Sequence, residues 1–259
     1  MKLFARPNLL NDYHLLAYDE LDSTNDEARR LAFGGGSHGA IVWAKRQSQG
    51  KGRMGRDWVS EEGNLFFSML LCPHADEKTI TQLSFVAAVA VIQTIRSILP
   101  EEHDIHCKWP NDILFKGRKI AGILLESFET DAQEGAEDPG RQRWVVVGVG
   151  INVDSYPSDT TLPATCLKEA GVEIISAKIV LSRFIHHFIT AYDIWAKRGF
   201  SPIRRLWIES GYRIGKTIEV KLPKERHSGI FEGIDANGGL LIRKNDGKRI
   251  TISAGEVTA

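Results

Sequence analysis

Glycines and cations alternate in QSQGKGRMGRDW, residues 47–58. The chemistry that such a loop suits is binding of phosphate or carboxylate groups, because Arg53 offers a planar fork of donors and Lys51 a point charge. Trp58 closes the run and can stack on a base. Glycine lets the backbone approach a ligand closely and bend. We expect three joints in a flexible loop that closes over the anions: Gly50, Gly52 and Gly55.

Two other interpretations of this loop are weaker. The G-x-G-x-x-G spacing matches a dinucleotide-binding turn, but that turn needs a helix after it. RDWVSEEGNLFF (56–67) has no helical period and contains Gly63. A plain solvated basic loop is the other alternative. It would leave Trp58 beside solvent. Each glycine also destabilises regular structure by about 0.5–1 kcal/mol relative to alanine.

Four further stretches carry polar residues where a strand or helix begins or turns. They are DSTN (22–25), KWPNDI (108–113), RKIAGILLE (118–126) and GVGIN (148–152). Taken alone, each has an ordinary explanation: a helix cap, a proline turn, the start of a strand, and a bulge. Their joint occurrence with the glycine-rich loop is the stronger signal.

The elements that would position these residues follow from hydrophobic periodicity. Predicted helices cover 22–33, 79–99, 176–199 and 201–211. Predicted strands cover 40–47, 64–72, two strands within 106–127, and 143–153. Thr24 and Glu27 form a capping-box pattern, and Ser201-Pro202 resembles another helix start. Residues 129–142 are acidic and contain Gly and Pro, so we expect a solvated loop there.

From residue 212 the sequence consists of short strand-like runs joined by DANGG and NDG turns. We therefore predict two domains, a catalytic domain over 1–211 and a small β-barrel over 212–259.

Composition narrows the class of protein. The 259 residues include 33 basic and 33 acidic side chains, which argues against extensive coating of nucleic acid. Cys72, Cys107 and Cys166 are far apart and odd in number, so we expect a reducing cytoplasm. The first residues lack the apolar core of a signal peptide, and no run of about 18 apolar residues predicts a membrane span.

In their order and separation, the five stretches resemble the catalytic domain of biotin protein ligases over roughly residues 18–155. The resemblance implies an α+β fold. It would combine a mixed sheet with helices, like the core of class II aminoacyl-tRNA synthetases, and a C-terminal SH3-like barrel. It also implies activation of biotin by ATP to biotinyl-5'-AMP, with release of pyrophosphate. A lysine of a biotin carboxyl carrier protein, for example of acetyl-CoA carboxylase, would then take the biotin.

Site roles implied by the resemblance divide into three groups. The biotin-binding residues are Ser23, Thr24, Asn25, Gln47, Lys51, Gly52, Arg53 and Lys119. The adenylate-binding residues are Trp58, Asn111 and Asn152. The catalytic cations are Arg53 and Lys119. Position 51 is a lysine where the family frequently has arginine. The positive charge is therefore kept, but the planar pair of N–H donors of a guanidinium is lost. Arg56 has no assigned role.

Magnesium is expected with ATP, although the sequence assigns no ligands to it, and the family frequently forms homodimers. Two alternatives stay open. One is a lipoate or octanoate ligase of related fold, against which the glycine-rich basic run and KWPND argue. The other is a non-enzymatic nucleic-acid-binding module, which the neutral net charge disfavours.

Some relatives of this family carry an N-terminal helix-turn-helix and repress biotin genes. Seventeen residues precede the region of resemblance here, too few for such a domain. We therefore predict no binding to operator DNA in a gel-shift assay. A sequence-specific shift of duplex DNA would contradict this expectation.

Overall fold

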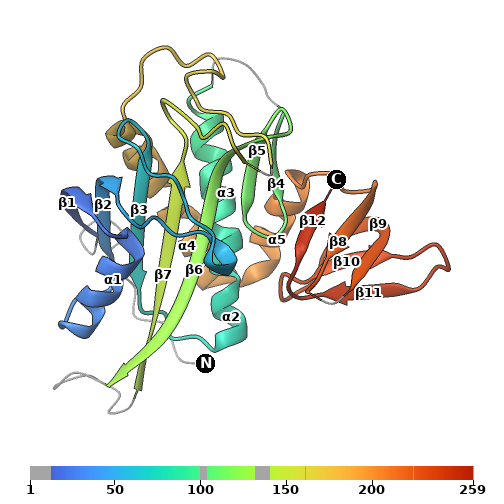
Figure 1. Ribbon diagram of the computed structural model, residues 1–259. Helices are drawn as coiled ribbons and strands as arrows, with labels where there is room; N and C mark the ends of the chain where they lie inside the picture. The colour runs from blue at the N-terminus through green and yellow to red at the C-terminus, as the bar shows by residue number, and fades with distance from the viewer. Residues whose placement is uncertain (1–12, 100–103, 132–140, 161, 224, 259) are drawn as a thin grey trace.

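The computed structural model describes residues 13–99, 104–131, 141–160, 162–223 and 225–258. In these ranges the chain forms two sheets, a mixed sheet flanked by helices and a smaller antiparallel sheet beside it (Figure 1). The order in the first is β1-β2-β3-β7-β6-β5-β4, and in the second β11-β10-β9-β8-β12.

The first sheet is mixed because β1 pairs in parallel with β2, whereas all its other pairs are antiparallel. Its strands are β1 (His14–Leu21), β2 (Ala40–Gln47), β3 (Leu65–Leu71), β4 (Ile105–Lys108), β5 (Asp112–Phe115), β6 (Arg118–Asp131) and β7 (Arg141–Ile151). The sequence did not predict β1, because this edge strand is largely exposed and lacks a run of buried apolar residues. The acidic loop was predicted too long: 129–131 and 141–142 belong to the β6–β7 ladder, and 132–140 lie outside the described residues.

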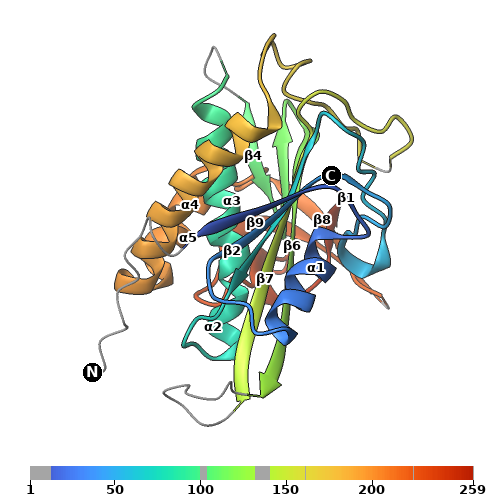
Figure 2. The same ribbon diagram turned by 90° about the vertical axis from the view of Figure 1, so that its left-hand side faces the viewer.

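Helices cover both faces of this sheet (Figure 2). The helices on one face are α2 (Glu77–Thr81), α3 (Leu83–Arg96), α4 (Ala177–Arg198) and α5 (Phe200–Glu209), and α1 (Thr24–Phe33) lies on the other. The larger core forms between the sheet and the α3–α4 layer, and a smaller apolar cluster lies under α1. α3 is apolar on nearly every side because it is buried on nearly every side.

The segment Glu77–Arg96 is long and apolar enough to cross a membrane by length and composition. However, 72% of its most apolar window is buried inside the protein. Burial of this extent is typical of a core helix. The sequence prediction concerned an unbroken run of about 18 apolar residues, and this segment contains Glu77, Lys78 and Gln82.

Helix starts differ from the sequence prediction in two places. The N-cap of α1 is Ser23, without a side-chain cap bond, so the capping box was wrong. The Thr24 hydroxyl instead contacts Gln47 Oε1, and Glu27 accepts from Tyr18 and Arg30. Before α5 the cap is Gly199, which has a φ of 73°.

The second sheet contains β8 (Thr217–Lys221), β9 (Arg226–Ile234), β10 (Leu240–Arg243), β11 (Arg249–Ile252) and β12 (Glu256–Thr258). The sequence predicted four of these strands and missed the short β12. Trp109 joins this sheet to the first one, because its Nε1 donates to Gly238 O at 3.0 Å. Gly238 has a φ of 85°, and the Phe85 ring occupies the space that a Cβ there would need.

The aromatic core between β3 and α4 offers a test of the fold. Phe184 is fully buried, with its ring 4.8 Å from Phe67 and 5.6 Å from Phe188. We predict that Phe184→Ala lowers the free energy of unfolding by about 3–5 kcal/mol, through lost burial and a residual cavity. The control Ile174→Ala, at a side chain 95% exposed, should change it by less than about 0.5 kcal/mol. Urea unfolding measures both, and equal effects would contradict the described core.

Candidate active-site cleft

A cleft of about 850 Å³ opens between the first sheet, the glycine-rich loop and the edge of the second sheet. All the residues that the sequence predicted to bind ligand line it. They are Ser23, Thr24, Asn25, Gln47, Lys51, Gly52, Arg53, Trp58, Asn111, Lys119 and Asn152. Two of the predicted joints, Gly50 and Gly55, lie in the loop but outside this lining.

A polar corner forms where α1 begins and β2 ends. Gln47 Oε1 accepts from the Thr24 amide N–H at 2.8 Å and from its hydroxyl at 3.0 Å. Gln47 Nε2 donates to Ser60 Oγ, whose hydroxyl donates in turn to the Trp58 carbonyl. Ser23 is 1% exposed, and its hydroxyl takes part in none of the hydrogen bonds recorded for the described residues. The corner therefore holds Gln47 in one orientation and leaves one hydroxyl for a ligand.

Three glycines of β6 and β7 form the floor of the cleft. A Cβ at Gly150 would overlap the Trp58 indole, as would one at Gly122. A Cβ at Gly148 would overlap the Asn25 amide. These two side chains therefore lie directly on the backbone of the sheet, as close approach to glycine allows.

The glycine-rich loop is folded as a narrow hairpin. Lys51 and Asp57 form an antiparallel bridge, and Trp58 N–H donates to Gly50 O at 2.9 Å. Its tip is a single 3-10 turn, Arg53–Gly55, and Gly55 has a φ of 71°. No α-helix follows it in the described chain, so the structure does not contain the strand–turn–helix unit of a dinucleotide-binding fingerprint.

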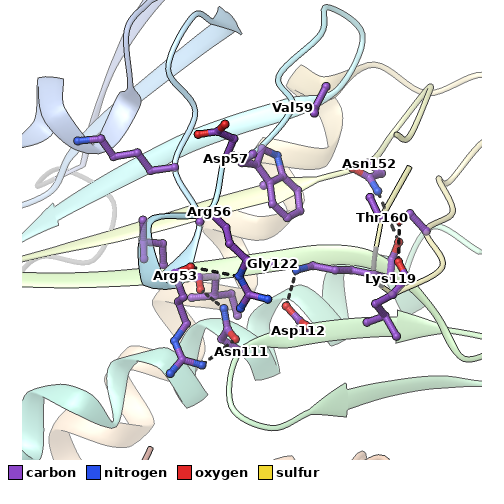
Figure 3. Close-up of a pocket in the computed structure, with 18 of the residues that line it drawn as sticks. Arg53, Arg56, Asp57, Val59, Asn111, Asp112, Lys119, Gly122, Asn152 and Thr160 are labelled. Atoms are coloured by element: carbon purple, nitrogen blue, oxygen red, sulfur yellow. Dashed lines mark hydrogen bonds and ion pairs between the residues drawn. The ribbon is translucent and has the colours of Figure 1, made fainter. Parts of the chain in front are cut away.

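Cations converge on the side of the cleft where the loop faces β5 and β6. Figure 3 shows Arg53 pointing towards Asn111, and Lys119 towards Asp112. Arg53 Nη1 donates to Asn111 Oδ1 at 3.2 Å, and Lys119 Nζ lies 2.6 Å from Asp112 Oδ1. Burial lowers the pKa of the Arg53 guanidinium, yet an arginine stays protonated in proteins. Lys119 Nζ also lies 5.1 Å from the centroid of the Trp58 ring.

Asn111 holds its place through the neighbouring strand. Its Nδ2 donates to Ile123 O at 2.7 Å, and its own carbonyl accepts from Ile123 N–H. Asn152 is fixed similarly, since its Nδ2 donates to Thr165 O at 2.9 Å. No hydrogen bond recorded for the described chain uses Asn152 Oδ1, which leaves this oxygen for a donor.

Two other loop cations have partners outside the loop. Lys51 Nζ lies 2.6 Å from Asp26 on α1. Arg56, which the sequence left without a role, pairs with Glu256 on β12 at 2.9 Å. The Arg56 guanidinium holds the pKa of the Glu256 carboxyl below its ordinary value. The hairpin is thus attached both to α1 and to the second sheet, although each exposed pair contributes only about 0–1 kcal/mol.

Sequence reasoning missed several residues of this site. Asp112 and Lys108 lie inside KWPNDI, so a signal for them was present, and burial lowers the pKa of the Lys108 amine. Another wall of the cleft has no such motif. It is formed by Pro157, Asp159, Thr160, Leu162, Pro163 and Ala164. Only the fold brings this segment over the site, through the backbone bond from Lys119 N–H to Pro163 O.

Metal binding by the protein alone has little support. Among the described residues, no three His, Cys, Asp or Glu side chains form a group that could hold a metal ion. Two of the carboxylates in the cleft, Asp112 and Glu256, are each paired with a cation. The described part of the cleft therefore offers no such group of ligands.

Comparisons with known proteins agree with the geometry. Residues 19–136 match the Biotin/lipoate A/B protein ligase family, and residues 214–258 match the Biotin protein ligase C terminal domain. The bifunctional ligase/repressor BirA of Bacillus subtilis is 37% identical over 93% of this chain and 73% of its own length. The biotin--[acetyl-CoA-carboxylase] ligase of Paracoccus denitrificans is 36% identical over 91% of this chain and 96% of its own.

A solved structure shows the same fold. The biotin protein ligase of Aquifex aeolicus in complex with biotin and ATP superposes with a TM-score of 0.77 and 28% sequence identity. The match covers 94% of this chain and 97% of that one, so both sheets are included.

Proposed function

The chain belongs to the biotin protein ligase family, and from that premise we propose how its cleft divides the work of the reaction. The protein is an ATP-dependent biotin ligase. It activates biotin with ATP to biotinyl-5'-AMP, releases pyrophosphate, and transfers the biotin to a lysine of a biotin carboxyl carrier protein. The observation that carries this conclusion is that five separate motifs line one cleft.

The polar corner is the proposed site of the biotin ring. The ureido group carries one acceptor and two N–H donors. The Ser23 hydroxyl has no side-chain partner among the described residues. Thr24 and Gln47 hold each other in place, since Gln47 Oε1 accepts from the Thr24 amide N–H at 2.8 Å and from its hydroxyl at 3.0 Å. Asn25 lies beside them on Gly148. Such convergent, preorganised polar groups in a largely apolar pocket give a ligand its orientation.

The other half of the cleft is the proposed adenylate site. Trp58 presents a ring backed by Gly122 and Gly150, against which adenine would pack. Asn152 Oδ1 is the group proposed to accept from the adenine edge. Asn111 would support the phosphate or ribose side through Arg53, because Asn111 Oδ1 accepts a hydrogen bond from the Arg53 guanidinium.

The reaction brings two anions together, because the biotin carboxylate attacks the α-phosphorus of ATP. Two unit charges about 4 Å apart repel by about 4 kcal/mol at an effective dielectric constant near 20. Arg53 and Lys119 are the cations proposed to offset this repulsion and stabilise the charge that develops in the transition state. Lys51 and Gly52 would complete the loop over the carboxylate, with Gly50, Gly52 and Gly55 as joints. The substrate carboxylate is itself the nucleophile, so the protein need not provide one.

Magnesium is proposed to arrive with ATP, since this cation is usually held by substrate phosphates with few protein ligands. We further propose that the mixed sheet is related to the class II aminoacyl-tRNA synthetase core, and that 212–259 form an SH3-like domain. The neutral net charge favours a protein partner over nucleic acid. Free Cys72, Cys107 and Cys166 support a cytoplasmic location. Homodimer formation stays a prediction.

The decisive measurement is ATP–pyrophosphate exchange. We predict exchange that depends on biotin and magnesium, with no comparable rate when lipoate or octanoate replaces biotin. The physical reason is that the polar corner can form hydrogen bonds with the N–H and C=O groups of a cyclic urea. An alkyl or dithiolane end has no such groups. Exchange driven equally by lipoate would instead favour the lipoate ligase alternative, and tight salt-sensitive RNA binding without exchange would favour the nucleic-acid module.

Arg53 gives a second test. Removing its guanidinium takes away a half-buried cation from the proposed adenylate site, so Arg53→Ala should release bound adenylate roughly tenfold faster or more. Filter retention of radiolabelled adenylate measures the rate. Arg46→Ala is the matched control, because Arg46 is exposed and lies outside the cleft lining. Unchanged retention in the Arg53 variant would contradict the assigned role.

A further inference from the structure

Two polar residues outside the cleft lining, Ser68 and Glu126, contact the Asn25 amide from opposite sides. Asn25 Nδ2 donates to Glu126 Oε2 at 2.6 Å, and Ser68 Oγ lies 2.6 Å from Asn25 Oδ1. Ser68 is fully buried on β3, directly opposite Gly148 of β7. Glu126 approaches from the neighbouring strand β6. Together with the glycine beneath it, they hold the amide on three sides.

The Glu126 carboxylate fixes which way this amide points. A carboxylate only accepts hydrogen bonds, so Asn25 must present Nδ2 to it and Oδ1 to Ser68. Rotating the amide by half a turn would place Oδ1 against the carboxylate. Gln47 is fixed by equivalent logic, because its Oε1 already accepts from the Thr24 amide N–H. The corner therefore has two amide oxygens of defined position.

Counting protons in this corner shows that acceptor lone pairs outnumber donors. Three oxygen–oxygen contacts run in series: Asn25 Oδ1 to Ser68 Oγ at 2.6 Å, Ser68 Oγ to Thr24 Oγ1 at 2.8 Å, and Thr24 Oγ1 to Gln47 Oε1 at 3.0 Å. Each of the two hydroxyls has one proton. The Thr24 amide N–H also serves Gln47 Oε1, so each oxygen has one donor when Thr24 donates to Ser68 and Ser68 donates to Asn25. No proton of these two hydroxyls is then left to donate to a ligand, whereas the amide oxygens keep a second lone pair that can accept an N–H.

We propose that Glu126 and Ser68 are positioning residues that select the biotin ring, by holding Asn25 Oδ1 as an acceptor in a corner where acceptors outnumber donors. Asn25 and Thr24 line the cleft, so a ligand can donate an N–H to either of them. A cyclic urea has such N–H donors, whereas a dithiolane or a saturated alkyl end has none. The inference rests on the proposed function and adds a physical basis for its selectivity.

The test compares acceptor strength at position 126. Glu126→Ala frees the Asn25 amide to rotate, so the KM for biotin should rise about tenfold, the size expected for one lost hydrogen bond to a charged group. Glu126→Gln can still accept from Asn25 Nδ2 but no longer excludes the rotated amide, so its KM for biotin should rise less than that of the alanine variant. The KM for ATP should change by less than about twofold in both, since the adenylate side is untouched. Pyrophosphate exchange measures both KM values in the unaltered protein and in each variant.

A paired substitution sharpens the test without changing side-chain volume. Asn25→Asp places a carboxylate against Glu126 and should raise the KM for biotin at least tenfold. Adding Glu126→Gln restores a donor for that carboxylate and should recover most of the loss, as a double-mutant cycle would record. Glu129→Gln is the control, because Glu129 lies on the same strand and pairs with Arg143 at 2.6 Å. It should leave the KM for biotin unchanged.

Outcomes separate this inference from the function it rests on. An unchanged KM for biotin in Glu126→Ala overturns the positioning role alone, as do equal effects of Ala and Gln. Equal increases in the KM for ATP and the KM for biotin overturn it as well. So does a double variant whose KM for biotin shows no recovery. Absence of biotin-dependent exchange in the unaltered protein would overturn the proposed function and this inference together.

Discussion

The site depends on bare backbone at the centre of the first sheet. Gly122, Gly148 and Gly150 lie on the long β6–β7 pair, and two side chains from elsewhere in the chain rest directly on them. The Asn25 amide occupies one place and the Trp58 indole the other. A methyl group at either place would displace the side chain above it. The rest of the cleft is arranged around these two planar groups, one proposed for each half of the biotinyl-adenylate.

Charge balance is the second organising feature. Cations at the mouth of the cleft lie against carboxylates: Lys119 against Asp112, Lys51 against Asp26, and Arg56 against Glu256. Incoming phosphate and carboxylate groups must therefore exchange with protein partners that are already present. Such exchange keeps the positive charges in place before binding and avoids an uncompensated cluster when the site is empty. Arg53 differs, because its described side-chain partner is the neutral Asn111.

The sequence predicted the residues of the site more completely than the edge strands of the two sheets. The resemblance to the biotin protein ligase family identified eleven lining residues, because the five motifs that carry them occur in the family's order and separation. Edge strands β1 and β12 were missed, since half-exposed strands lack a clear apolar alternation. The cleft wall near Thr160 was invisible for a different reason: its position follows from long-range pairing and not from local pattern. Ser68 lies in none of the motifs, and Glu126 ends the RKIAGILLE motif without an assigned role, because both act through Asn25.

Trp109 has a consequence for how the two sheets behave as a body. The indole leaves from the turn that also holds Asn111 and Asp112, and it donates to Gly238 in the second sheet. Any outward swing of the smaller sheet would break this bond and pull on the turn beneath the reacting groups. The turn that carries Asn111 is thus tied to the smaller sheet across the predicted boundary near residue 211.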